Sequence, residues 1–110
     1  MPIDQKSVHY EYVPDEFYTF VLMLDLEMFE VGAQVSTLTS LEKVIDEMSE
    51  KTRGELGAFL SYLLSKKYSD AFMEEIWQGA GSRWRLSPGY HRIIYEHALQ
   101  HIRKSTGNGG

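Results

Sequence analysis

Apolar residues recur at steps of three and four along most of the chain, which is the spacing of one face of an α-helix. The clearest series follows Pro14, a residue that suits the first turn of a helix. Its apolar face consists of Phe17, Phe20, Val21, Leu24, Met28 and Val31, widened by Leu22, Leu26 and Phe29. Its limited solvent side is marked by Asp25, Glu27 and Glu30. We therefore expect this helix, which ends at Gly32, to be the central and most enclosed one.

Four more helices are predicted farther along the chain. Two begin at Thr39 and Thr52, because a glutamate follows each threonine three residues later, as in a capping box. Another follows Ser69 as its cap, and the last begins at Ser87-Pro88. The residues expected to face the core from these helices are Leu41, Val44, Ile45, Met48, Leu56, Phe59, Leu60, Leu63, Leu64, Phe72, Met73, Ile76, Trp77, Tyr90, Ile94, Tyr95, Ala98, Leu99 and Ile102.

The pattern predicts an all-α fold, a compact single-domain bundle of about five helices over residues 1–104. We expect an extended arm rather than a helix before Tyr12, and a flexible, Gly-rich tail over residues 105–110. Gly54 and Gly57 fall in the third predicted helix, where glycine allows another helix to approach closely.

Composition narrows the class of protein. The 110 residues suffice for one hydrophobic core, and 43% hydrophobic with 25% charged residues is ordinary for a globular domain. The chain has no cysteine, which excludes a disulfide framework and a thiolate metal site. No secretory signal is visible, and the longest apolar stretch, Phe20–Leu24, is far too short to cross a bilayer. We therefore expect a cytoplasmic protein without a membrane contact or a cofactor.

Charge is divided unequally along the chain. Residues 11–50 hold ten carboxylates and one base, Lys43, for a formal charge of −9, whereas residues 51–110 sum to +4. Such a field repels nucleic acid and attracts basic proteins, although a solvated face kept acidic for solubility gives the same composition. Three acids have expected local roles at helix N-termini: Asp15, Glu16 and Glu42. The acids that remain as candidates for a partner surface are Asp25, Glu27, Glu30, Asp46, Glu47 and Glu50.

Two histidine patterns are candidates for chemistry. His97 and His101, one helical turn apart, could present two imidazoles to one metal ion, but the sequence fixes no third ligand, so we expect no metal site. His91, beside the arginines of residues 83–92, has the residue types for phosphodiester cleavage, and the same basic patch could instead bind nucleic acid. The acidic half of the chain opposes both, so we expect neither an enzyme nor a nucleic-acid partner. A helical nucleic-acid-binding regulator is the alternative, ahead of a phosphodiesterase.

Residues 44–104 carry an ordered series of apolar and turn motifs. The series runs Val44-Ile45-Asp46-Glu47, the leucine-rich Leu56–Leu64, Ser69-Asp70, the turn residues Gly79 and Gly81, and a closing helix that ends His101-Ile102-Arg103-Lys104. This order resembles the small helical immunity proteins of bacterial contact-dependent growth inhibition systems, over roughly Tyr18–Lys104. Relatives commonly have a His-Gln-Asp-Trp-like stretch after the first helix, where this chain has Glu27-Met28-Phe29-Glu30. The resemblance therefore leaves the cognate toxin open.

The resemblance implies stoichiometric inhibition without catalysis. Family members bind and neutralise the C-terminal toxin domain, often a nuclease, that a neighbouring cell delivers. A nuclease site is basic because it holds phosphates, so an acidic helical surface would complement it. The predicted partner-binding residues are Asp25, Glu27, Glu30, Asp46, Glu47 and Glu50, with Phe29 and Trp84 as apolar anchors. Self-association is left open.

Overall fold

The computed structural model describes residues 13–83, 86–87 and 89–107, and within them it is all-α, as predicted. The elements in chain order are α2 (Asp15–Val31), the 3-10 turn η1 (Gly32–Gln34), α3 (Thr37–Asp46), α4 (Glu50–Ser65), α5 (Asp70–Gly79) and α6 (Tyr90–Gly107). The predicted N-terminal arm lies outside the described residues. None of the helices in the described part combines the length and apolar character that crossing a membrane requires.

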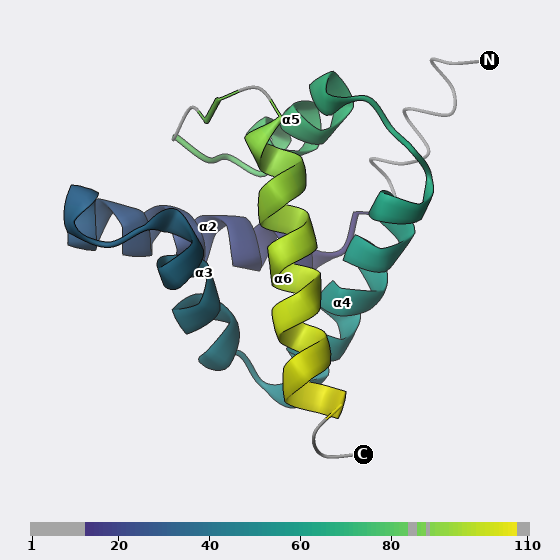
Figure 1. Cartoon of the computed structure of the whole chain (residues 1–110), viewed down its shortest axis with the longest axis horizontal. Coiled ribbons are helices and arrows are strands. Elements are labelled where there is room, and N and C mark those ends of the chain that lie inside the picture. The colour runs from purple at the N-terminus through teal and green to yellow at the C-terminus, as the bar shows by residue number, and fades with distance from the viewer. Residues whose placement is uncertain (1–12, 84–85, 88, 108–110) are drawn as a thin grey trace.

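Helix α6 holds the bundle together. It packs against α3, α4 and α5, while α2 packs against α3 and α4. In Figure 1, α6 crosses in front of α2, with α3 on the left, α4 on the right and α5 near its upper end. The first helix, predicted to be the most enclosed, has a larger solvent side than expected, because Leu22, Leu26 and Phe29 of α2 are exposed.

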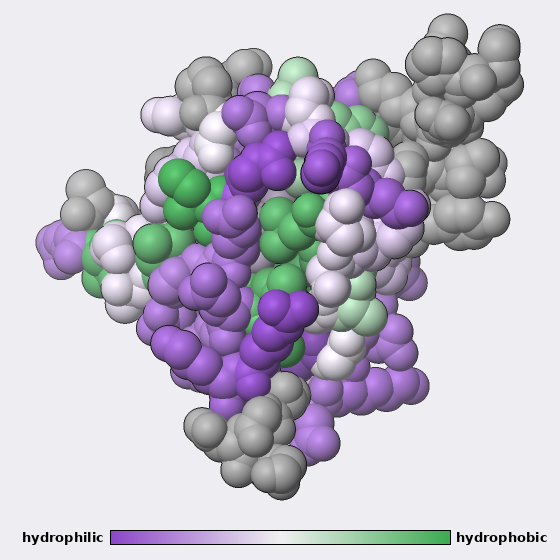
Figure 2. Space-filling model, turned by 45° about the vertical axis from the view of Figure 1, so that its right-hand side comes forward, coloured by the Kyte–Doolittle hydropathy of each residue, from purple (hydrophilic) through white to green (hydrophobic). Residues whose placement is uncertain are grey.

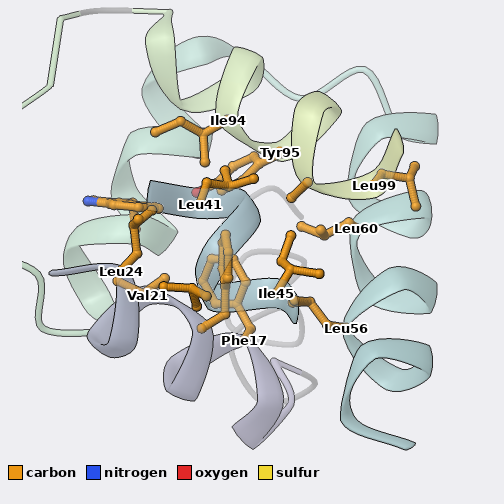
Figure 3. Packing of buried hydrophobic residues seen from close by; sticks show 14 of the residues in the cluster. Phe17, Val21, Leu24, Leu41, Ile45, Leu56, Leu60, Ile94, Tyr95 and Leu99 are labelled. Carbon is orange, nitrogen blue, oxygen red and sulfur yellow. The ribbon is translucent and has the colours of Figure 1, made fainter. Parts of the chain in front are cut away.

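The core forms where α2, α3, α4 and α6 turn their apolar faces toward one another (Figure 3). Phe17 is fully buried and meets the rings of Phe59 and Tyr95 edge-on, with centroids 5.2 and 5.8 Å away. The Tyr95 hydroxyl donates to the Met73 carbonyl oxygen at 2.8 Å, which links α6 to α5. Burial raises the pKa of Tyr95 well above its ordinary value, so the hydroxyl keeps the proton that it donates.

Two helices begin one turn earlier than the capping boxes predict. The hydroxyl of Ser36 accepts from the Thr39 backbone N–H, and that of Ser49 accepts from Thr52, each at 3.2 Å. Each threonine therefore lies inside the first turn, hydrogen-bonded to the capping serine. The cap at Ser69 is confirmed, since its side chain accepts from the Phe72 backbone N–H at 3.1 Å. A serine and a threonine three residues apart compete for the capping role, and the sequence pattern alone does not rank them.

The close helix approach expected at the two glycines occurs at one of them. A Cβ atom at Gly57 would lie 3.2 Å from Ile102 Cγ2, so α4 and α6 come together there. At Gly54 no atom lies within 4 Å of that position. Helix α6 also continues to Gly107, so residues 105–107 are helical and do not belong to the predicted tail.

Candidate functional site

One side of α2 exposes a row of large apolar side chains. Leu22 is 44% exposed, Leu26 58% and Phe29 73%, and their spacing of four and three residues places them on one helix face. We call these three residues the exposed row. Sequence periodicity assigned them to the widened core face, which is wrong because the described helices pack against the other side of α2. Apolar side chains reach the surface among hydrophilic ones on the face drawn in Figure 2.

An acidic edge runs beside the exposed row, where α2 meets α3. Lys43 of α3 donates from Nζ to Glu27 Oε2 of α2 at 3.1 Å. This hydrogen bond raises the pKa of Lys43, and attraction from Glu27, Glu47 and Glu30 raises it further. Three carboxylates thus act on one ammonium group, which is in contact with Glu27 alone among them, and the four groups sum to a formal charge of −2. We call Glu27, Glu30, Glu47 and Lys43 the acidic edge.

The sequence pattern places Asp25 on the solvent side of its helix, but this prediction is wrong, because Asp25 is 94% buried. Its Oδ1 accepts from the Ser82 hydroxyl at 2.7 Å and from the Arg83 backbone N–H at 3.1 Å. The Arg83 Nε lies 3.9 Å from Oδ2. A carboxylate can be buried when donors surround it, and here it ties the segment after α5 to α2. Asp25 therefore positions a loop and is not part of the accessible acidic surface.

Two carboxylates of α3 pair with two histidines of α6. The Nε2 atom of His97 lies 2.7 Å from Glu42 Oε2, and that of His101 lies 2.8 Å from Asp46 Oδ1. Glu42 therefore links two helices and does not close a capping box. Each imidazole meets a different carboxylate, and no group of three or more His, Cys, Asp or Glu side chains that could hold a metal ion occurs among the described residues.

The other predicted partner residues are placed separately. Glu50 is exposed and lies in the first turn of α4, where a carboxylate interacts favourably with the helix dipole. Glu47 and Phe29 are exposed, as a binding role requires. Trp84, the second predicted anchor, lies outside the described residues. The structure thus leaves Glu30, Glu47 and Phe29 exposed, whereas Glu27 is bonded to Lys43 and Asp25 is buried.

Most of the residues that were candidates for phosphate chemistry have structural roles in the fold. His91 is 0% exposed, and its ring meets Trp77 edge-on with centroids 5.7 Å apart. Arg92 donates to Asp70 Oδ1 at 3.1 Å and to the Tyr68 carbonyl oxygen. Arg83 keeps 80% of its side chain exposed beside Asp25. A substrate phosphate has no route to the His91 imidazole in this arrangement.

The buried imidazole of His91 predicts a loss of stability in acid. Burial lowers its pKa below the ordinary 6.5, although attraction from Glu74 and Asp70 partly opposes this. The unfolded chain therefore binds a proton at higher pH than the folded chain, and the contribution of neutral His91 is complete above 6.5 and lost as pH falls below it. Between pH 7.5 and 5.5 this group alone is expected to remove up to about 1.4 kcal/mol from the free energy of unfolding.

The variant His91→Leu isolates this effect. Neither ring nitrogen has a hydrogen-bond partner among the described residues, so an apolar side chain of similar volume is expected to fold normally. Urea denaturation at pH 7.5, 6.5 and 5.5 should show the variant gaining on the natural chain as pH falls. Parallel pH profiles for the two proteins would contradict the prediction.

The geometry above stands without a relative to compare. No protein-family model, curated protein or solved structure matches this chain. The family resemblance of residues 44–104 therefore stays a prediction.

Proposed function

We propose that this chain is a non-catalytic inhibitor that binds a basic protein, and that it serves as the immunity protein of a contact-dependent growth inhibition toxin. The observation that carries the proposal is the acidic edge, where Glu27 pairs with Lys43, the single base of residues 11–50, and Glu30 and Glu47 also attract it. One ammonium group and three carboxylates leave this edge with a formal charge of −2, which attracts cations.

Electrostatics explains what such an edge contributes. A localised negative field steers a basic protein toward the surface and raises the rate of encounter, with a smaller effect on the lifetime of the complex. Toxin domains that cut nucleic acid hold phosphates in basic clefts, so they have the complementary charge. The family resemblance suggests that the partner is a toxin. The negative charge of the acidic edge supports a toxin domain that is basic.

The placement of the histidines favours binding over catalysis. His91 is enclosed by the core, while His97 and His101 each pair with a carboxylate of α3. A general acid–base must reach a substrate proton, directly or through one water. These three histidines therefore support helix packing, whereas Glu30 and Glu47 of the acidic edge are exposed.

The test uses the C-terminal domain encoded by the adjacent upstream reading frame as the probe. That domain, co-expressed with this chain, is expected to purify as a stoichiometric complex without toxin activity. The double variant Glu30→Lys with Glu47→Lys should lower the association rate constant at least tenfold at low salt, roughly the lower end of electrostatic steering. Raising the salt concentration should remove most of the difference between variant and natural chain.

A matched control carries the same change of charge elsewhere. Glu55 on α4 and Glu96 on α6 are exposed, so Glu55→Lys with Glu96→Lys alters net charge equally without touching the acidic edge. If both double variants lower the association rate constant equally, the effect comes from net charge and not from a local site at the acidic edge. Absence of a complex with the co-expressed domain would overturn the proposed function.

A further inference from the structure

The exposed row is unusual for its continuity. Single apolar residues at a protein surface are common, but Leu22, Leu26 and Phe29 follow one another along one face with exposure rising from 44% to 73%. Seven residues of helix span about 10 Å, so the row is long enough to receive two turns of a partner helix. Next to its first residue, a Cβ atom at Gly81 would lie 3.7 Å from Leu22 Cδ2, so the turn after α5 borders the row.

The two long sides of the row differ in charge. At about 100° per residue, Glu30 and Asp25 lie roughly 70° from the centre of the row on opposite sides. Glu30 belongs to the acidic edge, with Glu27 and Glu47 beyond it. Asp25 is covered by Ser82 and Arg83, and the Arg83 side chain is 80% exposed. One side of the row is therefore negative, and the other presents a guanidinium group.

We propose that the exposed row is a docking site for an amphipathic segment of the protein partner, with apolar side chains against Leu26 and Phe29 and basic side chains toward the acidic edge. This inference rests on the proposed function and adds the contact that holds the complex. The charges along the two sides of the exposed row favour a partner segment that carries basic side chains on the side of the acidic edge. A second copy of this chain has the same net charge of −5 and the same acidic edge, so two copies repel each other overall.

The row and the acidic edge have separable effects on kinetics. Charges that steer encounter act on association, whereas buried aromatic and aliphatic anchors act on dissociation. Phe29 is the anchor, because it is the most exposed large apolar side chain in the described part of the chain and would become buried against the partner. Arg83, on the far side, would face an acceptor group, which fixes the direction in which the segment lies.

The test measures dissociation of the complex with the co-expressed toxin domain. Phe29→Ala and Leu26→Ala are each expected to raise the dissociation rate constant at least about tenfold and to change the association rate constant less than about threefold. Tyr62→Ala on α4, where the tyrosine is 39% exposed, is the matched control and should leave both constants unchanged.

Three results would overturn the docking site. If Glu30→Lys with Glu47→Lys slows association but neither row variant speeds dissociation, the proposed function stands and the row is not its contact. If the isolated chain sediments as a dimer that Phe29→Ala dissociates, the occupant is a second copy. Nuclear Overhauser contacts from Leu26 and Phe29 to residues 1–12 in the free protein would assign the row to the chain's own N-terminal segment.

Discussion

Replacing Phe17 with alanine is expected to lower the free energy of unfolding by about 3–5 kcal/mol. The ring is fully buried and joins three helices, since it extends from α2 to Phe59 of α4 and Tyr95 of α6. Truncation removes the transfer free energy of the ring and leaves a cavity that rigid helices cannot close. Urea denaturation followed by circular dichroism at 222 nm measures the loss, which is large relative to the stability of a domain of this size.

The same substitution on the same helix provides the control. Phe29 lies twelve residues farther along α2 and is 73% exposed, so Phe29→Ala should change the free energy of unfolding by no more than about 0.5 kcal/mol. Comparable losses for the two variants would mean that Phe29 is buried in the isolated protein. That outcome would also remove the basis for a docking site on the exposed row.

Replacing Asp25 with alanine is expected to cost about 2–3 kcal/mol, although a carboxylate on a surface helix is usually dispensable. The substitution removes a charged acceptor from the Ser82 hydroxyl and the Arg83 backbone N–H. Ser82 is itself buried, so its hydroxyl would be left without this partner in a site that water enters poorly. The segment after α5 would lose its attachment to α2.

A double-mutant cycle separates the hydrogen bond from the other contacts of Asp25. Ser82→Ala alone should cost about 1 kcal/mol, and the double variant should cost less than the sum of the single variants by at least about 0.5 kcal/mol. The measurement is urea denaturation of all four proteins at pH 7. Strictly additive losses would show that the two side chains do not interact in solution.

Periodicity predicts the helices and their inner faces well because burial on one face is a local property of the sequence. It fails for α2, where apolar residues occupy most of the circumference. Which third of such a helix meets solvent depends on how many neighbours surround it, and that is decided by the packing of α3 and α4. For the same reason Asp25 was placed on the wrong side, since a charged residue within an apolar helix is buried only if another segment supplies donors.

Part of the candidate site can be predicted from local sequence, and part depends on contacts between residues that are far apart in the chain. The excess of carboxylates in residues 11–50 is visible in the sequence, and it correctly indicates an acidic surface at Glu30 and Glu47. The pairs Glu42–His97 and Asp46–His101 were missed, although both partners repeat at a spacing of four and each pair is separated by 55 residues. That matched spacing is a usable signal, but only the packing of α3 against α6 shows that the two carboxylates meet the two histidines.

The position of α6 in the chain determines when the protein can fold during its synthesis. Helices α3, α4 and α5 all precede α6 in sequence and all pack against it, so none has its complete set of neighbours on the ribosome until α6 has emerged. Until then Phe17 lacks the Tyr95 ring that it meets edge-on in the finished core, although α3 and α4 can already pack against α2. The matched ladder of α3 and α6, whose pairs advance in the same direction, also requires the two helices to run parallel, so the chain must turn back through α4 and α5 before they meet. The hydrophobic core is therefore complete only when the final helix has packed against the others.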